Sequence, residues 1–244
     1  MKILYFDCFS GISGDMVIGA LIDAGADPAY LTSALKKLQI EDEYELSFQK
    51  VVKNGISSTK FDVILKEAEH HHHSHRSYKH IVEMIKSAQF PEKAESFALR
   101  IFEKIGIAEG KIHGVPLEDV HFHEVGAVDS IIDIVGTAIL LDEFNADAIY
   151  ASPIPVGSGK IHIDHGIYPV PAPATLEILR GVPIATSDVK GELATPTGAA
   201  IVATWATEFG TLPSMTVEQI GYGAGTKTFP SHPNVLRVII GESI

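Results

Sequence analysis

The stretch that decides the fold reads His121-Phe122-His123-Glu124-Val125-Gly126-Ala127-Val128-Asp129-Ser130-Ile131-Ile132-Asp133-Ile134-Val135-Gly136. It places two imidazoles and three carboxylates beside some of the most apolar sequence in the chain. Apolar residues recur every three or four positions, which predicts a mostly buried helix over residues 129–144. On that helix Asp129, Asp133 and Thr137 are four residues apart, so they form one polar line.

That polar line has two readings. Two ionised carboxylates at i and i+4 repel each other, and burial makes it costlier to keep both charged, so a cation, a shared proton or a cluster of donors would resolve the conflict. Alternatively, Asp129 caps its own helix and Asp133 bonds to a neighbouring loop. His121 and His123 would share one face of an extended segment. Together with Glu124 they suit a divalent ion such as nickel, zinc or iron.

A second group of histidines precedes this stretch. It consists of His70, His71, His72, His73 and His75. Such a run is too polar for a core, and imidazole clusters of this kind bind nickel, copper or zinc with modest geometric demand. The alternative is a solvated linker that binds metal only by accident.

Two helix starts could hold an anion. The first follows a strand over residues 3–9 and a glycine loop, and its helix begins at Ser13, Gly14 and Asp15. The second begins at Thr195 and Thr197 around a proline, and Lys160 and Lys190 supply positive charge nearby in the sequence. The first loop lacks the Lys-Ser/Thr of a P-loop, and capping alone would explain the hydroxyls. Asp7 lies toward the C-terminal end of the first strand, where sites of α/β proteins usually lie.

The remaining pattern predicts an α/β protein with a mixed sheet flanked by helices. The sequence leaves open a division into two lobes, 1–115 and 116–244. Gly221 to Gly225 predict a turn or a close backbone approach. The other expected elements are helices over 28–38, 78–88, 91–107, 173–179 and 196–209, a hairpin of 44–52 with 60–66, and strands over 148–155 and 235–240.

The composition of the chain argues against several classes of protein. The chain has 244 residues, 45% hydrophobic and 20% charged, with a net charge of −12. Strong acidity argues against nucleic acid, whose phosphates call for a basic face. One cysteine, Cys8, excludes an internal disulfide. No signal peptide and no run of about 20 apolar residues is seen, so we expect a soluble cytoplasmic protein that binds no membrane.

Six ordered motifs together closely resemble the LarC family of nickel-insertion proteins, over nearly the whole chain. They are Tyr5–Met16, the 70–75 run, the 121–136 stretch, His165-Gly166 with Pro169–Thr175, Glu192–Gly198, and Gly221–Gly225 with Pro233-Asn234-Val235-Leu236-Arg237.

The resemblance implies insertion of Ni(II) into pyridinium-3,5-bisthiocarboxylic acid mononucleotide, giving the nickel-pincer cofactor of lactate racemase-type enzymes. It also implies a lyase-class cyclometallase that consumes CTP with Mn(2+) or Mg(2+). Nickel must be held by ligands that can later release it, and imidazole and carboxylate groups suit this role. A proton must also leave the ring carbon, so a base is needed. We therefore expect His121, His123 and Glu124 to hold nickel or remove the proton. Asp129 and Asp133 would be further ligands or would orient them, Asp7 and Asp15 would complete the site, and the 70–75 run would collect nickel.

Longer family members continue into a CTP-handling domain that this sequence does not contain. CTP and its Mn(2+) or Mg(2+) ion are therefore expected to bind through a separate C-terminal portion. The alternatives are a non-catalytic nickel store or metallochaperone and a metal-dependent hydrolase. The sequence leaves open whether the chain forms a homo-oligomer.

Overall fold

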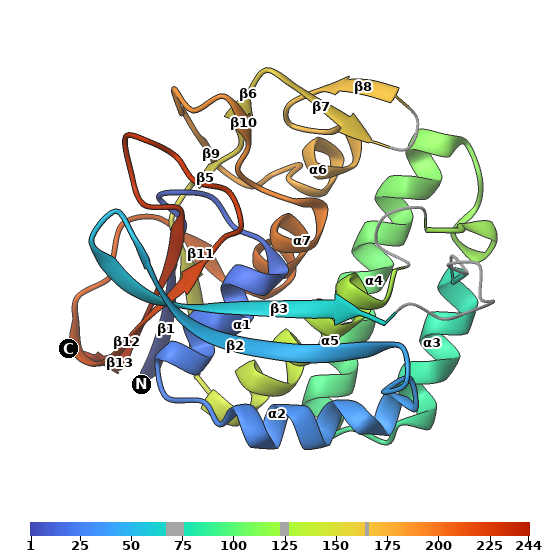
Figure 1. Cartoon of the computed structure of the whole chain (residues 1–244), viewed down its shortest axis with the longest axis horizontal. Helices are drawn as coiled ribbons and strands as arrows, with labels where there is room; N and C mark the ends of the chain where they lie inside the picture. Colours follow the sequence, from blue (N-terminus) through green and yellow to red (C-terminus); the bar gives the residue numbers. More distant parts are fainter. Residues whose placement is uncertain (67–75, 123–126, 164–165) are drawn as a thin grey trace.

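The computed structural model of the protein describes residues 1–66, 76–122, 127–163 and 166–244. Its main strands are β1 (Lys2–Asp7), β2 (Tyr44–Lys53), β3 (Ile56–Leu65), β4 (Ala148–Ala151), β11 (Glu208–Phe209), β12 (Met215–Ala224) and β13 (Val235–Ser243). They form one mixed sheet in the order β11-β4-β1-β13-β12-β3-β2, which confirms the predicted fold class (Figure 1).

Helices pack against this sheet and against one another (Figure 1). They are α1 (Gly14–Asp23), α2 (Pro28–Leu35), α3 (Tyr78–Ser87), α4 (Glu92–His113), α5 (Val128–Phe144), α6 (Pro173–Ile178) and α7 (Pro196–Trp205), with short 3-10 turns at Lys36–Leu38 and Leu117–Asp119. Three small two-stranded pairings complete the fold: β5 (Ile154–Pro155) with β9 (Ile184–Ala185), β6 (Gly157–Ser158) with β10 (Gly191–Glu192), and β7 (Lys160–Ile163) with β8 (Gly166–Pro169).

Two predicted helix ends were wrong. Helix α4 continues past residue 107 to His113, and Gly114 then ends it in the left-handed region at φ 70°, a conformation that glycine adopts without strain. Helix α7 stops at Trp205 rather than at 209 because the chain turns back to the sheet. The N–H of Thr207 donates to Ile149 O at 2.8 Å, and β11 then pairs with β4.

Helix α1 lies directly on the sheet. A Cβ atom at Gly221 or Gly223 of β12 would collide with the backbone of α1, and one at Gly19 of α1 would collide with β3. These glycines therefore allow a close approach of two backbones. The sequence prediction of a close approach at Gly221–Gly225 is confirmed, whereas the alternative of a turn is wrong, because residues 221–224 belong to β12.

Helix α5 is the centre of the core, as its apolar pattern predicted. Ile131, Ile132, Ile134 and Leu140 are fully buried. Buried residues on both sides of positions 110–120 belong to one hydrophobic core; the division into two lobes stays a prediction. None of the helices in the described ranges is long and apolar enough to cross a membrane.

Candidate nickel and mononucleotide site

The N-termini of α1 and α7 lie side by side. The loop after β1 forms a parallel bridge between Ile12 and Ala194. The N–H of Ile12 donates to Leu193 O at 2.9 Å, and the N–H of Thr195 donates to Ile12 O at 3.1 Å. Gly198 has no room for a side chain, since a Cβ would collide with the carbonyl of Ile12. The structure thus brings together two segments that the sequence predicted separately as anion sites, Ser13–Asp15 and Thr195–Thr197.

Helix α5 meets α1 at the same place. A Cβ on Gly14 would lie 2.5 Å from Cβ of Asp133. Ser13 is the N-cap residue of α1, but its side chain does not cap the helix; instead its hydroxyl bonds to the carboxylate of Asp15. The backbone N–H of Asp15 donates to Asp133. Asp133 of α5 therefore takes the role of a helix cap for α1.

Lys60 of β3 completes this cluster from the hairpin. Its Nζ donates to Asp15 Oδ2 at 2.8 Å and to the carbonyl of Phe61 at 2.8 Å. It also lies 2.7 Å from Asp62 Oδ1, and its side chain is only 11% exposed. We call Asp15, Lys60, Asp62 and Asp133 the α1–α5 cluster. It holds three carboxyl groups and one ammonium.

Asp133 is the least satisfied member of the cluster. Its Oδ1 is sealed from solvent and has no hydrogen-bond partner among the described residues. Burial raises the pKa of the Asp133 carboxyl well above its ordinary value, and repulsion from Asp15 and Asp129 adds to the effect. Lys60 and the Asp15 backbone N–H oppose it. A buried carboxyl with an uncommitted oxygen can bind a proton or a cation.

The other residues predicted for the metal site have separate places. His121 is exposed and bridges Ser77 in antiparallel fashion. Asp129 is exposed in the first turn of α5, where its Oδ1 accepts the N–H of Ser130 at 2.8 Å. The N-cap residue of α5 is Ala127, so Asp129 does not occupy the capping position that the simpler interpretation expected. The remaining predicted ligands lie outside the described residues; they are His70, His71, His72, His73, His75, His123 and Glu124.

Asp7 points away from the α1–α5 cluster. Gly221 and Gly223 face α1, so Tyr222 between them faces the other side of the sheet. Tyr222 is in register with Arg237, and Arg237 with Asp7. Arg237 Nε donates to Asp7 Oδ2 at 2.9 Å, and its second nitrogen bonds to the same oxygen. The carboxylate of Asp7 is thus paired on the face opposite to α1.

The predicted phosphate-binding residues differ in their surroundings. Thr195 caps α7, because its hydroxyl accepts the N–H of Gly198 at 3.1 Å. Thr197 is 6% exposed in the first turn of that helix. Lys160 is exposed on β7, which belongs to a separate two-stranded sheet. The structure therefore groups Ser13, Gly14, Asp15, Thr195 and Thr197, whereas Lys160 belongs to a different element, β7.

A preformed metal centre is not found in the described part of the chain. No three His, Cys, Asp or Glu side chains within it are grouped closely enough to hold an ion. Cys8 is fully buried, and burial raises the pKa of its thiol, so a thiolate ligand is disfavoured at neutral pH. Any nickel site at the α1–α5 cluster would need donors from residues 123–126 or from the 70–75 run.

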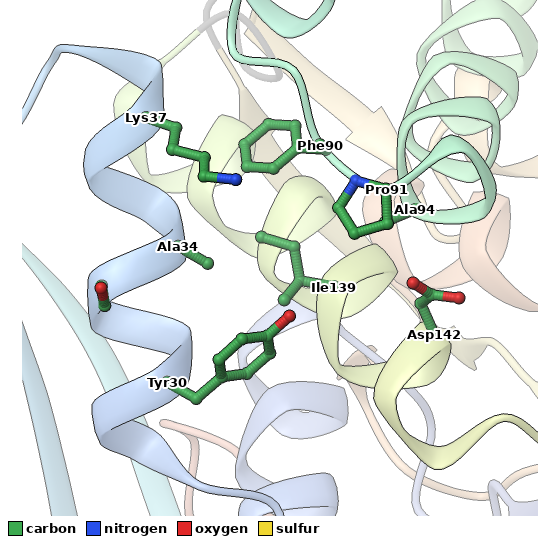
Figure 2. Close-up of a pocket in the computed structure, with 9 residues that line it drawn as sticks. Tyr30, Ala34, Lys37, Phe90, Pro91, Ala94, Ile139 and Asp142 are labelled. Carbon is green, nitrogen blue, oxygen red and sulfur yellow. The ribbon is translucent and has the colours of Figure 1, made fainter.

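One pocket of about 140 Å³ lies elsewhere, between α2, the start of α4 and α5 (Figure 2). It is lined by Tyr30, Ser33, Ala34, Lys37, Phe90, Pro91, Ala94, Ile139 and Asp142. Figure 2 shows the Lys37 ammonium beside the Phe90 ring, and the two are 5.9 Å apart. None of the predicted site residues lines this pocket.

Lys60 and Asp62 were missed from the sequence. Because side chains alternate along a strand, Lys60 and Asp62 could have been placed on one face of β3, opposite to Phe61. Nothing in the sequence, however, indicated that this face meets the start of α1, 45 residues earlier.

Comparisons with known proteins show the family of the chain. A family model described as "Nickel insertion protein" matches residues 4–244. A pyridinium-3,5-bisthiocarboxylic acid mononucleotide nickel insertion protein of Geobacillus kaustophilus is 56% identical over 99% of this chain. A protein of the same name from Staphylococcus epidermidis is 52% identical over 99% of the chain, and a putative nickel insertion protein of Dictyoglomus thermophilum is 48% identical over 100% of it.

The chain spans 60%, 60% and 62% of the lengths of these three relatives. No solved structure gives a significant match. The match over residues 4–244 and the identities of 48–56% over almost the whole chain are decisive: this chain belongs to the nickel insertion protein family.

Proposed function

We propose that this chain takes part in inserting Ni(II) into pyridinium-3,5-bisthiocarboxylic acid mononucleotide, the substrate named in its relatives. The observation that carries the proposal is the match of 99% of the chain to a relative of that name at 56% identity. The α1–α5 cluster is compatible with it only as a neighbouring group, because Asp133 keeps one sealed oxygen without a partner while the described carboxylates do not by themselves form a metal site.

The chemistry sets three requirements. Nickel arrives as Ni(II), binds two sulfurs, and forms a bond to the ring carbon between them as the proton on that carbon leaves. The first requirement is a set of nitrogen and oxygen ligands that can release nickel. The second is a base that titrates near neutral pH, for which histidine is the natural candidate. The third is a site for the phosphate of the mononucleotide.

We assign the first two requirements to the 121–133 stretch. His121, His123 and Glu124 hold nickel or accept the ring proton, with Asp129 and Asp133 as further ligands or as residues that orient them. The run His70, His71, His72, His73 and His75 collects nickel. Asp7, the remaining residue predicted to be catalytic, is paired with Arg237 on the opposite face of the sheet, so we propose that it acts through the sheet rather than by touching nickel.

The third requirement fits the joined N-termini of α1 and α7. A helix N-terminus offers backbone N–H groups and the positive end of the helix dipole to a phosphate. Asp133 already accepts the N–H of Asp15 at α1. We therefore place the phosphate at α7, near Thr195 and Thr197, with Ser13, Gly14 and Asp15 forming the adjoining wall. Lys160 would have to approach from β7 when the mononucleotide binds.

We further propose that the reaction is of the lyase class and depends on CTP with Mn(2+) or Mg(2+). The curated relatives are longer than this chain, which covers 60% of the first two. The additional length of such relatives is where we place CTP handling. The partner of this chain is then a C-terminal portion of that kind, and the chain itself acts as the module that holds nickel and the mononucleotide.

The test is a His121→Ala, His123→Ala double variant. Nickel binding is measured by calorimetry on this chain. Insertion is followed as the mass increase of the mononucleotide after addition of CTP, Mg²⁺ or Mn²⁺, and the C-terminal portion of a longer relative. The proposal predicts loss of insertion and at least tenfold weaker nickel binding, on the order of 1.4 kcal/mol.

The matched control is His80→Ala, His162→Ala, which removes two imidazoles from exposed positions outside the 121–133 stretch. It is expected to bind and insert nickel as the unchanged chain does. Equal behaviour of the two double variants would refute the assignment to residues 121–124.

A further inference from the structure

The pocket between α2, α4 and α5 is formed by one face of α2. Four lining residues of α2 and of the 3-10 turn that follows it are three or four positions apart, so they lie on one side of the helix; they are Tyr30, Ser33, Ala34 and Lys37. Ala34 is the smallest of these side chains, and Ala94 of α4 is equally small. Together they leave a space of about 140 Å³ beside Ile139 of α5.

The walls of this pocket are apolar and aromatic. Phe90 is 7% exposed, Ile139 3% and Ala94 2%. Figure 2 shows the rings of Phe90 and Tyr30 on two sides of the pocket, with Ile139 between them. An apolar cavity of about 150 Å³ in another protein is large enough to bind benzene. The pocket therefore has the size and the lining for a single aromatic ring.

Two opposite charges face each other across the same space. Figure 2 shows the ammonium of Lys37 on one side of the pocket and the carboxylate of Asp142 on the other. Lys37 lies 5.9 Å from the centre of the Phe90 ring. Within residues 1–66, 76–122, 127–163 and 166–244, neither Lys37 nor Asp142 forms an ion pair. Both charges are therefore available to a ligand.

The arrangement of charges selects the kind of ligand. A purely cationic molecule would meet Lys37, and a purely anionic one would meet Asp142 as well as the net charge of −12 of the chain. A molecule with a negative group at one end and a positive group at the other complements both sides of the pocket.

We propose that this pocket binds a small aromatic zwitterion, that is, one ring with a carboxylate at one end and an ammonium at the other. The carboxylate pairs with Lys37, the ammonium pairs with Asp142, and the ring lies against Ile139 between Phe90 and Tyr30. The binding is non-covalent. The proposal goes beyond the proposed function, because none of these residues belongs to the nickel and mononucleotide site.

The test uses 4-(aminomethyl)benzoate as the probe and measures its binding to the chain by titration calorimetry. A ligand of this size is expected to bind with a dissociation constant of about 1 mM. Benzoate and benzylamine each lack one of the two charges. Each is expected to bind about fivefold more weakly, since the ion pairs are partly exposed to solvent. Equal binding of all three compounds would overturn the pairing with Lys37 and Asp142.

Three variants locate the probe. Ala34→Leu fills the pocket and is expected to abolish binding. Lys37→Met should bind the zwitterion about fivefold more weakly and should no longer distinguish it from benzylamine. Asp142→Asn should lose affinity to the same extent and should no longer distinguish the zwitterion from benzoate. These two variants keep the proposal testable if Ala34→Leu does not fold.

The matched controls are Lys36→Met and Glu143→Gln. Each removes an exposed charge next in sequence to a pocket residue, and neither residue lines the pocket, so both are expected to bind the probe as the unaltered chain does. Binding that persists in a folded Ala34→Leu variant would overturn the site, as would no binding by the unaltered chain at a concentration about tenfold above the expected constant. The titration contains neither nickel nor mononucleotide, so its outcome is independent of the proposed function.

Discussion

Two carboxylate–cation groups occupy opposite faces of the same sheet. On the face opposite to α1, which we call the outer face, Asp7 of β1 and Arg237 of β13 lie directly opposite each other. One guanidinium there binds one carboxylate. On the helix side, one ammonium from Lys60 serves two carboxylates, and Asp133 beside them keeps an oxygen without a partner.

The difference shows how a structural ion pair can be told from a candidate site. The outer pair joins neighbouring strands in register, so the sheet itself fixes its geometry. The α1–α5 cluster joins a helix, a hairpin and a second helix, and it leaves charge and hydrogen-bonding capacity unused. Unused capacity in a buried group is costly unless a ligand or proton satisfies it, and for that reason the cluster, rather than the outer pair, is the candidate site.

The largest effect is expected for Gly14→Ala, which tests whether the contact of α1 with α5 supports the cluster. The added Cβ would lie 2.5 Å from the Asp133 Cβ. The helices must separate, which we expect to cost about 1–3 kcal/mol of unfolding free energy. Urea denaturation measures this loss of unfolding free energy. Gly210→Ala is the control, because nothing lies within 4 Å of its Cβ position; equal losses in the two variants would contradict the packing argument.

The outer pair is tested by Arg237→Met. It leaves Asp7, whose side chain is 16% exposed, without its cation. The arginine side chain is 40% exposed, so solvent screening reduces the effect, and we expect a loss of about 1 kcal/mol. Nickel affinity should not change.

The charge-neutral double variant Asp7→Asn, Arg237→Gln should recover part of that loss in urea denaturation. A folded double variant that no longer binds nickel would place Asp7 at the metal and would remove the contrast between the two faces.

The pH dependence of stability tests Asp133. A carboxyl with a raised pKa holds its proton more tightly in the folded chain than in the unfolded chain, whose ordinary value is 3.8. Its contribution to stability is therefore complete below that value and is lost as the pH rises through the raised pKa. Asp133→Asn mimics the protonated form at every pH.

The variant should therefore gain stability relative to the unaltered chain between about pH 4 and about pH 8. Urea denaturation at the two pH values measures the difference. A difference that stays constant would mean that the pKa of Asp133 is not raised in the folded chain.

The smallest effect on stability is expected for His121→Ala. The side chain is exposed, and the antiparallel bridge to Ser77 is made by the backbone. The change in unfolding free energy, measured from the shift of the thermal midpoint, should be within about 0.5 kcal/mol. Any loss of nickel binding by this variant is then a functional effect; a large fall in the midpoint would show instead that the imidazole supports the fold.

Local sequence determined much of this protein. The apolar period of residues 129–144 specified a buried helix, and Thr195 and Thr197 around a proline specified a second helix start. The alternating pattern of residues 44–52 and 60–66 specified the hairpin. These features depend on neighbours a few residues apart, so periodicity and capping rules are sufficient to find them. The motifs were also sufficient to indicate the family.

Only the tertiary structure decided which carboxylates meet. Asp7 and Asp15 are eight residues apart in sequence, yet strand alternation sends the first to the outer face, while the turn into α1 brings the second to Lys60 and Asp133. The contact of Gly14 with Asp133 joins positions 119 residues apart. Such contacts arise from how whole elements pack, because charge and burial at a site are set by side chains that no local pattern of residues relates to one another.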